Sequence, residues 1–167
     1  MKDVQETNTH IFFWGSFLSN FYPAKMKFAG IDFHTSEQLF MFLKAKYFED
    51  HEMADMIATR GQDPKDAKRF GRKVVGFDNE VWEGAREDMM YIACQRKFMD
   101  EDLLKQLLAT EEKVLVEGSP FDKIWGVGLV YDGETILDEK NWDGLNLLGK
   151  VLMRVRTDIR DIISQKK

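Results

Sequence analysis

The sequence predicts a single, mostly helical domain with a few short strands. Apolar residues repeat at helical spacing behind residues that cap helices, and short alternating segments lie beside turns that contain Gly or Pro. The length of 167 residues suits one domain, or at most two small lobes that share a core. We expect the polar residues 1–10 to form a flexible N-terminus and residues 11–163 to form the domain.

Composition and charge exclude several classes of function. The net charge of −5 provides no general basic field for nucleic acid, which leaves room only for a local basic patch. Cys94 is the single cysteine, so no internal disulfide forms, and this fits a reducing cytosol. The three histidines show no spacing typical of a metal site. No signal peptide is recognised and no apolar run approaches 18 residues, so we expect a cytoplasmic protein that does not enter a membrane.

The first strands precede the helices. Ile11–Trp14 is a short apolar run, and the loop-like segment after it carries aromatic residues, among them Phe21, which either fill the core or face a ligand. Lys25–Phe28 and Ile31–His34 alternate around an Ala-Gly pair and predict a two-stranded hairpin.

The stretch His34–Lys46, HTSEQLFMFLKAK, predicts the helix around which the chain is organised. Thr35 and Gln38 have the spacing of a capping box, and Glu37 would lie in the first turn, where the helix dipole favours a carboxylate. Glu37 and Lys44 then share one face of a mostly apolar helix. This pattern indicates a functional face, although a solvated first-turn acid and a lysine that extends over the core explain it too.

Further helices follow in the middle of the chain. His51–Thr59 predicts a short helix, and Asp63 with Pro64 marks the start of the next one. The segment KDAKRFGRKV follows Pro64 directly and carries five cations. A solvated basic helix face is the usual meaning of such a cluster, and phosphate contact is the less common one.

The longest predicted helix is Asn79–Met99, with Asp78 as its cap. Trp82 and Arg86 lie one turn apart on it, and a guanidinium beside an indole suits an anion joined to a flat ring. An arginine that reaches a carboxylate at the edge of the core is the structural alternative. The helix after it, capped by Asp100, turns its leucines inward.

The last third of the chain combines a strand, a turn and a helix. Lys113–Glu117 alternates as a strand does, and a final amphipathic helix begins near Leu145. Between them, Asp122, Trp125 and Gly126 lie on a turn and would supply a carboxylate, a stacking plane and a close backbone approach. A tight turn closed by a buried Trp explains the same residues equally well.

Together these residues suit a nucleotide-like substrate. The sequence has no GxSxG, Cys/His pair, P-loop or GxGxxG pattern, so serine hydrolases, kinases and dehydrogenases lack support. Cleavage of a ribose–nitrogen bond passes through an oxocarbenium-like ion, which a carboxylate stabilises while a second group protonates the leaving nitrogen. This reaction requires no cofactor.

Six segments resemble, in order, the YbiA-like N-glycosidase family, also called NADAR. The segments are SNFYP at 19–23, SEQLFMFLKA at 36–45, FGRKV at 70–74, WEGAREDMMYIACQRKF at 82–98, DKIWGVGL at 122–129 and GLNLLGKVLMRVR at 144–156. The resemblance implies an α+β, largely helical fold that hydrolyses the N-glycosidic bond of a phosphorylated ribosyl compound. In one branch the substrates are ribosylaminopyrimidine phosphates of riboflavin biosynthesis, which release ribose 5-phosphate. Another branch removes ADP-ribose from guanine in DNA.

The resemblance also implies the residues of the site. Glu37 falls on the acidic residue of the family motif and is the expected catalytic carboxylate. Our working hypothesis is that Glu37 acts as base, nucleophile or cation stabiliser and that Asp122 orients the ribose hydroxyls or assists protonation. In the same hypothesis Lys44 and Arg86 would hold the phosphate, and two indoles would lie against the base. The substrate-binding positions are Asn20, Phe21, Lys44, Trp82, Arg86, Trp125, Gly126 and Asn146.

One position departs from the family pattern. Gln38 stands where a histidine commonly follows the motif glutamate, so the substrate or rate differs here if that histidine moves protons. Two rivals to the small phosphorylated substrate stay open. ADP-ribosylated DNA needs a basic rim, and a non-catalytic nucleotide-binding module would tolerate loss of Glu37. The candidates for the rim are Lys65, Lys68, Arg69, Arg72 and Lys73.

Overall fold

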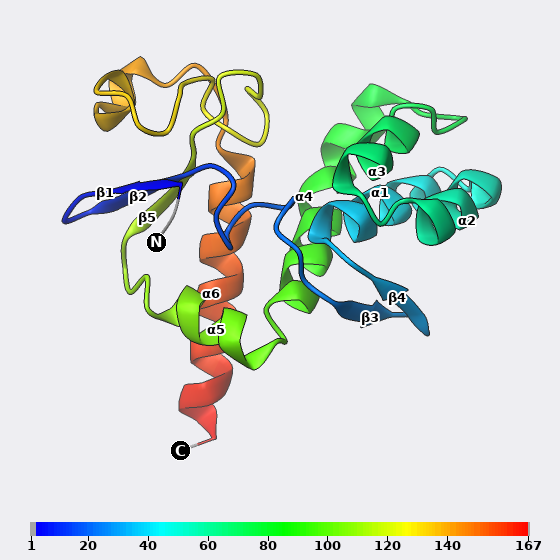
Figure 1. Cartoon of the computed structure of the whole chain (residues 1–167), viewed down its shortest axis with the longest axis horizontal. Helices are drawn as coiled ribbons and strands as arrows, with labels where there is room; N and C mark the ends of the chain where they lie inside the picture. Colours follow the sequence, from blue (N-terminus) through cyan, green and yellow to red (C-terminus); the bar gives the residue numbers. More distant parts are fainter. Residues whose placement is uncertain (1–2, 167) are drawn as a thin grey trace. The chain divides into compact units, whose positions relative to one another are not determined.

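The computed structural model describes residues 3–166, which divide into two units. The sheet unit consists of the described residues up to Ser19 together with those from Leu104 onward, and the helical unit is Asn20–Leu103. The described residues form six α-helices and five short strands, which confirms the predicted α+β, mostly helical fold (Figure 1).

The sheet unit is built on three strands in the order β1-β2-β5. β1 (Val4–Glu6) pairs antiparallel with β2 (His10–Phe13), which pairs parallel with β5 (Val114–Glu117). β1 lies in the segment that we expected to be flexible. Its polar sequence carries no strand pattern, and backbone pairing with the buried β2 holds it in place. Residues 1 and 2 of that predicted segment lie outside the described residues.

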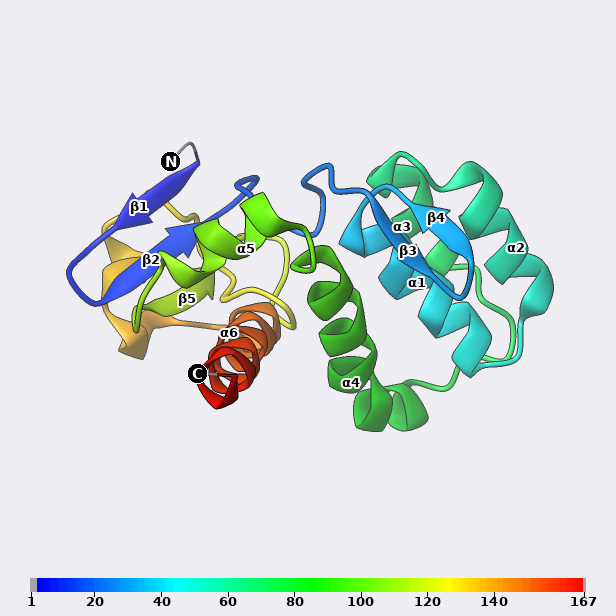
Figure 2. The same cartoon turned by 90° about the horizontal axis from the view of Figure 1, so that it is seen from below.

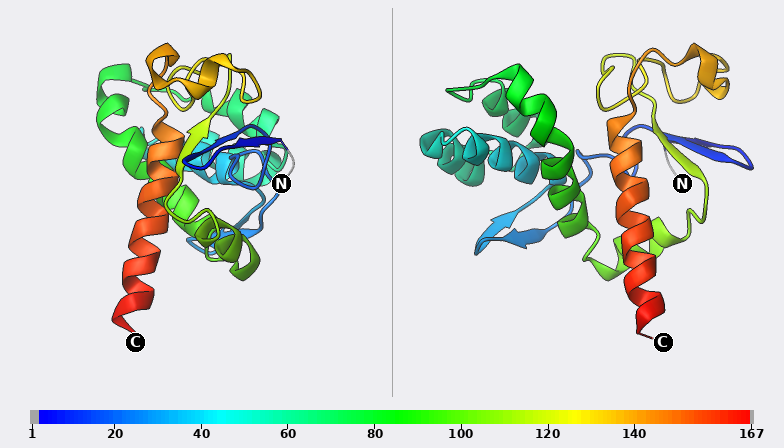
Figure 3. Two further views of the ribbon diagram at one scale, coloured as in Figure 1. Left: turned by 90° about the vertical axis from the view of Figure 1, so that its left-hand side faces the viewer. Right: turned by 180° about the vertical axis from the view of Figure 1, so that it is seen from behind.

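Helix α6 (Leu147–Gln165) runs alongside β5 (Figures 1 and 3). Two 3₁₀ turns, Thr135–Leu137 and Glu139–Asn141, precede it, and the half-buried Trp142 packs against the core of the unit. The fully buried members of that core are Phe12, Val116, Val127 and Ile136.

In the helical unit, α1 makes contacts with three other helices and with the β3–β4 hairpin (Figure 2). The two hairpin strands pair antiparallel, as predicted. A further helix, α5 (Glu101–Leu108), follows α4 in the chain and contains the boundary between the two units, after Leu103. The bounds in the helical unit are β3 Met26–Phe28, β4 Ile31–Phe33, α1 Ser36–Tyr47, α2 His51–Arg60, α3 Pro64–Gly71 and α4 Asn79–Lys97.

The predicted caps explain where these helices begin. The Thr35 hydroxyl accepts a hydrogen bond from the Gln38 backbone N–H, and Asp63 accepts one from Lys65 with Pro64 at the first helical position. Asp78 accepts one from Val81 at the start of α4. Each cap satisfies a backbone donor that the helix itself leaves unpaired, which is why short local patterns predict these boundaries.

Candidate active site

The first turn of α1 holds Glu37 in a buried position, with 7% of its surface exposed. Asn20 fixes this turn from outside the helix. Its backbone carbonyl accepts a hydrogen bond from the Glu37 N–H at 3.1 Å, and its side-chain oxygen accepts one from the Ser36 hydroxyl at 2.9 Å. Asn20, which we predicted to contact substrate, therefore positions the residue that we predicted to be catalytic.

Gln38 is fully buried and uses its whole amide group within the fold. Its Oε1 accepts a hydrogen bond from the His34 N–H at 2.8 Å, and its Nε2 donates to the Ile57 carbonyl at 3.0 Å. The side chain thus completes the cap of α1 and joins it to the last turn of α2. These contacts give the departure from the family pattern a structural reason, and its effect on substrate stays a prediction.

The face of α1 that carries Glu37 and Lys44 meets helix α3. Met41 lies on this face, one turn from each of the two, and a Cβ placed on Gly71 would overlap the Met41 sulfur and crowd its Cγ and Cβ. A larger residue at position 71 would require the Met41 side chain to move, and the glycine lets α3 lie close against α1. Arg72, the C-cap residue of α3, follows directly.

Lys44 is half-buried beside two rings and two charges. Its Nζ lies 4.5 Å from the centre of the Phe77 ring and 5.8 Å from that of Trp82. Burial lowers the pKa of Lys44, the Glu37 carboxylate raises it, and the Arg72 charge lowers it further. One carboxylate and two cations thus act on one another along the line where α1 meets α3.

Trp82 belongs to an aromatic cluster and has only 7% of its surface exposed. Phe77 is the more exposed of the two rings beside Lys44, with 43% of its surface accessible. No sequence pattern singled it out. The predicted stacking of Trp82 on a base stays a prediction. The rings around Trp82, with centroid distances, are Phe40 at 5.6 Å, Phe48 at 6.0 Å and Tyr47 at 6.1 Å.

Arg86 lies one turn beyond Trp82 on α4 and is half-buried. Its Nε atom is buried and donates no hydrogen bond within the described chain. Arg86 also forms no ion pair with any residue between 3 and 166, so the structure does not show the carboxylate partner of the structural alternative. A buried donor without a partner costs about 1–3 kcal/mol, which a ligand oxygen would recover.

The predicted site residues of the sheet unit shape a turn. The Asp122 carboxylate accepts hydrogen bonds from the N–H groups of Ile124 and Trp125 at 2.9 and 2.8 Å. A Cβ on Gly126 would lie 2.9 Å from the Asp122 carbonyl oxygen, so the turn requires a glycine there. The Trp125 carbonyl accepts a hydrogen bond from Leu148 in the first turn of α6.

Asn146 is buried at the start of α6 and bonds to the free edge of β5. Its Nδ2 donates to the Leu115 carbonyl at 2.9 Å and its oxygen accepts from the Glu117 N–H at 3.0 Å. Its φ of 52° is left-handed, a conformation that Asn tolerates better than most residues. These contacts favour the structural explanation of Asn146 and of the turn before it, while their predicted contacts with substrate stay predictions.

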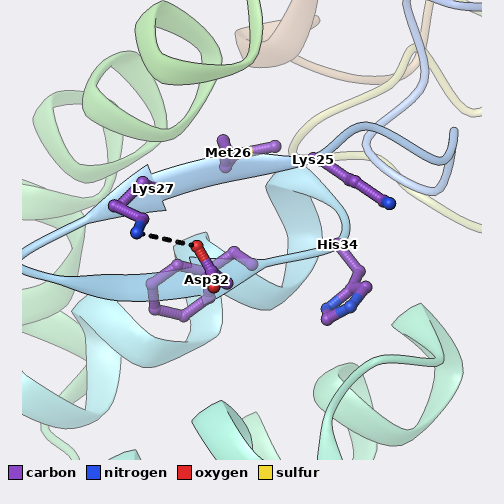
Figure 4. A pocket seen from close by; sticks show the side chains of 6 residues that line it. Lys25, Met26, Lys27, Asp32 and His34 are labelled. Atoms are coloured by element: carbon purple, nitrogen blue, oxygen red, sulfur yellow. Dashed lines mark ion pairs between the residues drawn. The ribbon is translucent and has the colours of Figure 1, made fainter.

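A pocket of about 410 Å³ lies along the β3–β4 hairpin but contains none of the predicted residues (Figure 4). Lys27 and Asp32 face each other there at 3.5 Å, and both are exposed. Among residues 3–166, no group of three or more His, Cys, Asp or Glu side chains is arranged to hold a metal ion. Over the same residues, no helix has the length and apolar character needed to cross a membrane.

Comparison with known proteins finds similarity over most of the chain. The NADAR domain model matches residues 12–160. N-glycosidase R617 of Acanthamoeba polyphaga mimivirus is 34% identical over 169 residues, which cover 92% of this chain and 98% of that protein. Riboflavin biosynthesis protein VVA0006 of Vibrio vulnificus is 31% identical over 146 residues, or 87% of this chain and 36% of that protein. The NMR structure of the E. coli protein YbiA superposes with a TM-score of 0.74 and 29% identity, covering 99% of this chain and 92% of that one.

Proposed function

This chain belongs to the NADAR domain family and is an N-glycosidase, and we propose that its substrate is a phosphorylated ribosyl compound of riboflavin biosynthesis. The family and the enzyme class agree with the resemblance in the sequence. The name of the relative from Vibrio vulnificus supports the substrate class, because that protein is called a riboflavin biosynthesis protein. The resemblance specifies ribosylaminopyrimidine phosphates, from which hydrolysis releases ribose 5-phosphate.

The observation that carries this proposal is the face shared by Glu37 and Lys44. A buried carboxylate lies two turns from a half-buried ammonium, with the Phe77 ring beside the ammonium and Arg86 on the neighbouring α4. A sugar–nitrogen bond joined to a phosphate and a flat base needs these groups: a carboxylate for the sugar, cations for the phosphate and rings for the base.

In the proposed reaction, the oxygen of a water molecule attacks C1 of the ribose and the C1–N bond breaks. The electron pair of that bond leaves with the nitrogen, which takes up a proton, so that over the whole reaction the water supplies OH to C1 and H to the nitrogen. Positive charge develops on the ribose in the transition state, and the Glu37 carboxylate stabilises it and accepts the proton of the attacking water. Burial strengthens this electrostatic effect because few water molecules screen the carboxylate.

Lys44 and Arg86 have the proposed role of binding the phosphate. Arg86 brings a buried Nε donor that no described residue uses, and Lys44 brings a charge that Glu37 stabilises. The roles of Asp122, Trp125, Gly126 and Asn146 toward substrate stay predictions.

A substrate panel tests the proposal. Purified protein is incubated with a ribosylaminopyrimidine phosphate and, separately, with DNA that carries ADP-ribosylguanine, and the released sugar is measured. We expect ribose 5-phosphate from the first and much slower release of ADP-ribose from the second. Release of ADP-ribose alone would show that the substrate is ADP-ribosylated DNA. Binding of either substrate without release of a sugar would show that the protein is a non-catalytic nucleotide-binding module.

A further inference from the structure

Helix α3 presents a basic face beside α1. Lys68 and Arg72 are four residues apart on α3, so their side chains leave the same side of the helix. The Lys68 Nζ lies 5.9 Å from the centre of the Phe21 ring, and Phe21 directly follows Asn20, which fixes the first turn of α1. The close contact of Gly71 with Met41 brings the end of α3 against α1 (Figure 1).

The cations of α3 differ in whether they already have an anionic partner. Arg69 forms an ion pair with Asp66 at 2.9 Å. Arg72 is exposed and forms no ion pair with any residue that the structure describes. Its charge instead acts on Lys44, another cation, whose pKa it lowers. The contact of Gly71 with Met41 brings Arg72 toward the face of α1 that carries Lys44. On that face Glu37 is the carboxylate that acts on Lys44. Two cations therefore share one carboxylate, and a bound anion would neutralise the remaining positive charge.

Phosphate is the anion that suits this pair of side chains. A guanidinium offers a planar fork of N–H donors that matches two phosphate oxygens, and an ammonium adds a point charge. We propose that Arg72 and Lys44 together bind the phosphate group of the substrate, which makes Arg72 a specificity-determining residue that distinguishes phosphorylated from unphosphorylated ribosyl compounds. This inference rests on the proposed function for the identity of the molecule that carries the phosphate.

The kinetic test compares Arg72→Gln with Arg69→Gln. Both variants remove one arginine charge from α3, but only Arg72 lacks a described anionic partner. We expect Arg72→Gln to lower kcat/KM for the phosphorylated substrate by roughly 10- to 100-fold, mainly through KM, since a charge-assisted hydrogen bond is lost. Its activity on the same compound without the phosphate should match that of the wild type. Arg69→Gln should leave both rates unchanged.

A binding measurement separates this inference from the proposed function. Calorimetry on the whole protein with ribose 5-phosphate requires no turnover, and Arg72→Gln should weaken its binding by roughly 10-fold or more. Arg72→Lys keeps the charge without the fork, so it should bind with intermediate affinity and serves if the glutamine variant does not fold. Binding that depends on Arg72 in a protein that hydrolyses nothing would overturn the proposed function alone. Equal constants for Arg72→Gln and Arg69→Gln, or no binding by the wild type, would overturn the role of Arg72.

Discussion

The two units use their predicted site residues in different ways. In the sheet unit, Asp122 and Asn146 direct their side chains to backbone groups of the same unit. In the helical unit, Arg86 has a buried donor without a described partner, and Lys44 lies beside another cation, Arg72. The first arrangement stabilises a turn and a strand edge, whereas the second leaves a buried donor unpaired and sets two cations beside the single carboxylate of Glu37.

This difference separates residues that hold the fold from residues suited to a ligand. Polar groups that complete backbone hydrogen bonds contribute to stability, and their removal leaves buried donors and acceptors unpaired. A charged group that is buried or lies beside a like charge reduces the stability of the fold. Proteins commonly retain such groups where function needs them. Substitutions in the two units should therefore affect different measurements.

Glu37→Gln should have the largest effect. The amide has nearly the shape of the carboxylate but no charge, so sugar release should fall by about 100-fold or more while the fold is kept. Turnover and thermal unfolding are measured side by side. Glu52 is the matched control, because it is also a first-turn acid, on the exposed start of α2. If Glu37→Gln retains the turnover of Glu52→Gln, Glu37 has no part in the chemistry.

Asn146→Ala should be the most damaging of these changes to stability in the sheet unit. It removes one buried and one partly buried hydrogen bond to β5 and places Ala at a φ of 52°, so the free energy of unfolding should fall by about 2–4 kcal/mol. Urea unfolding measures this loss. Asn141→Ala is the control, since the side chain of the exposed Asn141 donates one hydrogen bond, to the Thr135 carbonyl, and its loss should change stability little. Equal losses for the two variants would contradict a special structural role for Asn146.

Two arginines sharpen the comparison, since each has a buried Nε without a described partner. In the sheet unit, Arg156 also donates through NH1 to the Thr110 hydroxyl at 2.8 Å and the Lys113 carbonyl at 2.9 Å. Arg156→Met should therefore lower the free energy of unfolding by about 1–3 kcal/mol. Arg86→Met removes a buried donor that has no described partner, so the free energy of unfolding should stay the same or rise, while KM for the phosphorylated substrate should rise by about 10-fold. A loss of stability for Arg86→Met without one for Arg156→Met would contradict this comparison, because Arg86 would then be the arginine with the structural role.

Local sequence patterns predicted the helices of both units well. A cap such as Asp63 before Pro64 sets the start of a helix within a few residues, so it can be read directly from the chain. The position of Glu37 in the first turn of α1 was predicted as well, whereas its burial was not, since a solvated first-turn acid explained the same pattern. Helix ends were less certain, and α4 ends at Lys97 rather than at the predicted Met99.

Contacts between distant segments were beyond the sequence. β1 has no apolar alternation and exists because β2 offers a partner. The contact of Gly71 with Met41, which brings Arg72 toward Lys44, joins two helices whose relative placement no local pattern gives. Phe77 was missed for the same reason, since only packing against Phe48 brings its ring beside Lys44.

Alkaline pH should produce the smallest effect, with opposite signs in the two units. The pKa of Lys44 is lowered below 10.5, chiefly by burial, so between its folded pKa and 10.5 the unfolded chain binds more protons and stability rises with pH. The pKa of Tyr131 in the sheet unit is raised above 10.0, by partial burial and by Asp132 and Asp3. Above pH 10 the unfolded chain therefore releases the tyrosine proton first, and stability falls.

Difference curves isolate these two contributions. The free energy of unfolding is measured from pH 8 to 11 for the wild type, Lys44→Met and Tyr131→Phe. Lys97, whose pKa burial lowers to about 8, adds the same rise to all three proteins and cancels in the differences. Lys44→Met should remove part of the rise, and Tyr131→Phe should remove a fall above pH 10. Parallel curves for Lys44→Met and the wild type would mean that the folded helical unit does not disfavour the Lys44 charge, and the contrast between the units would then rest on the arginines alone.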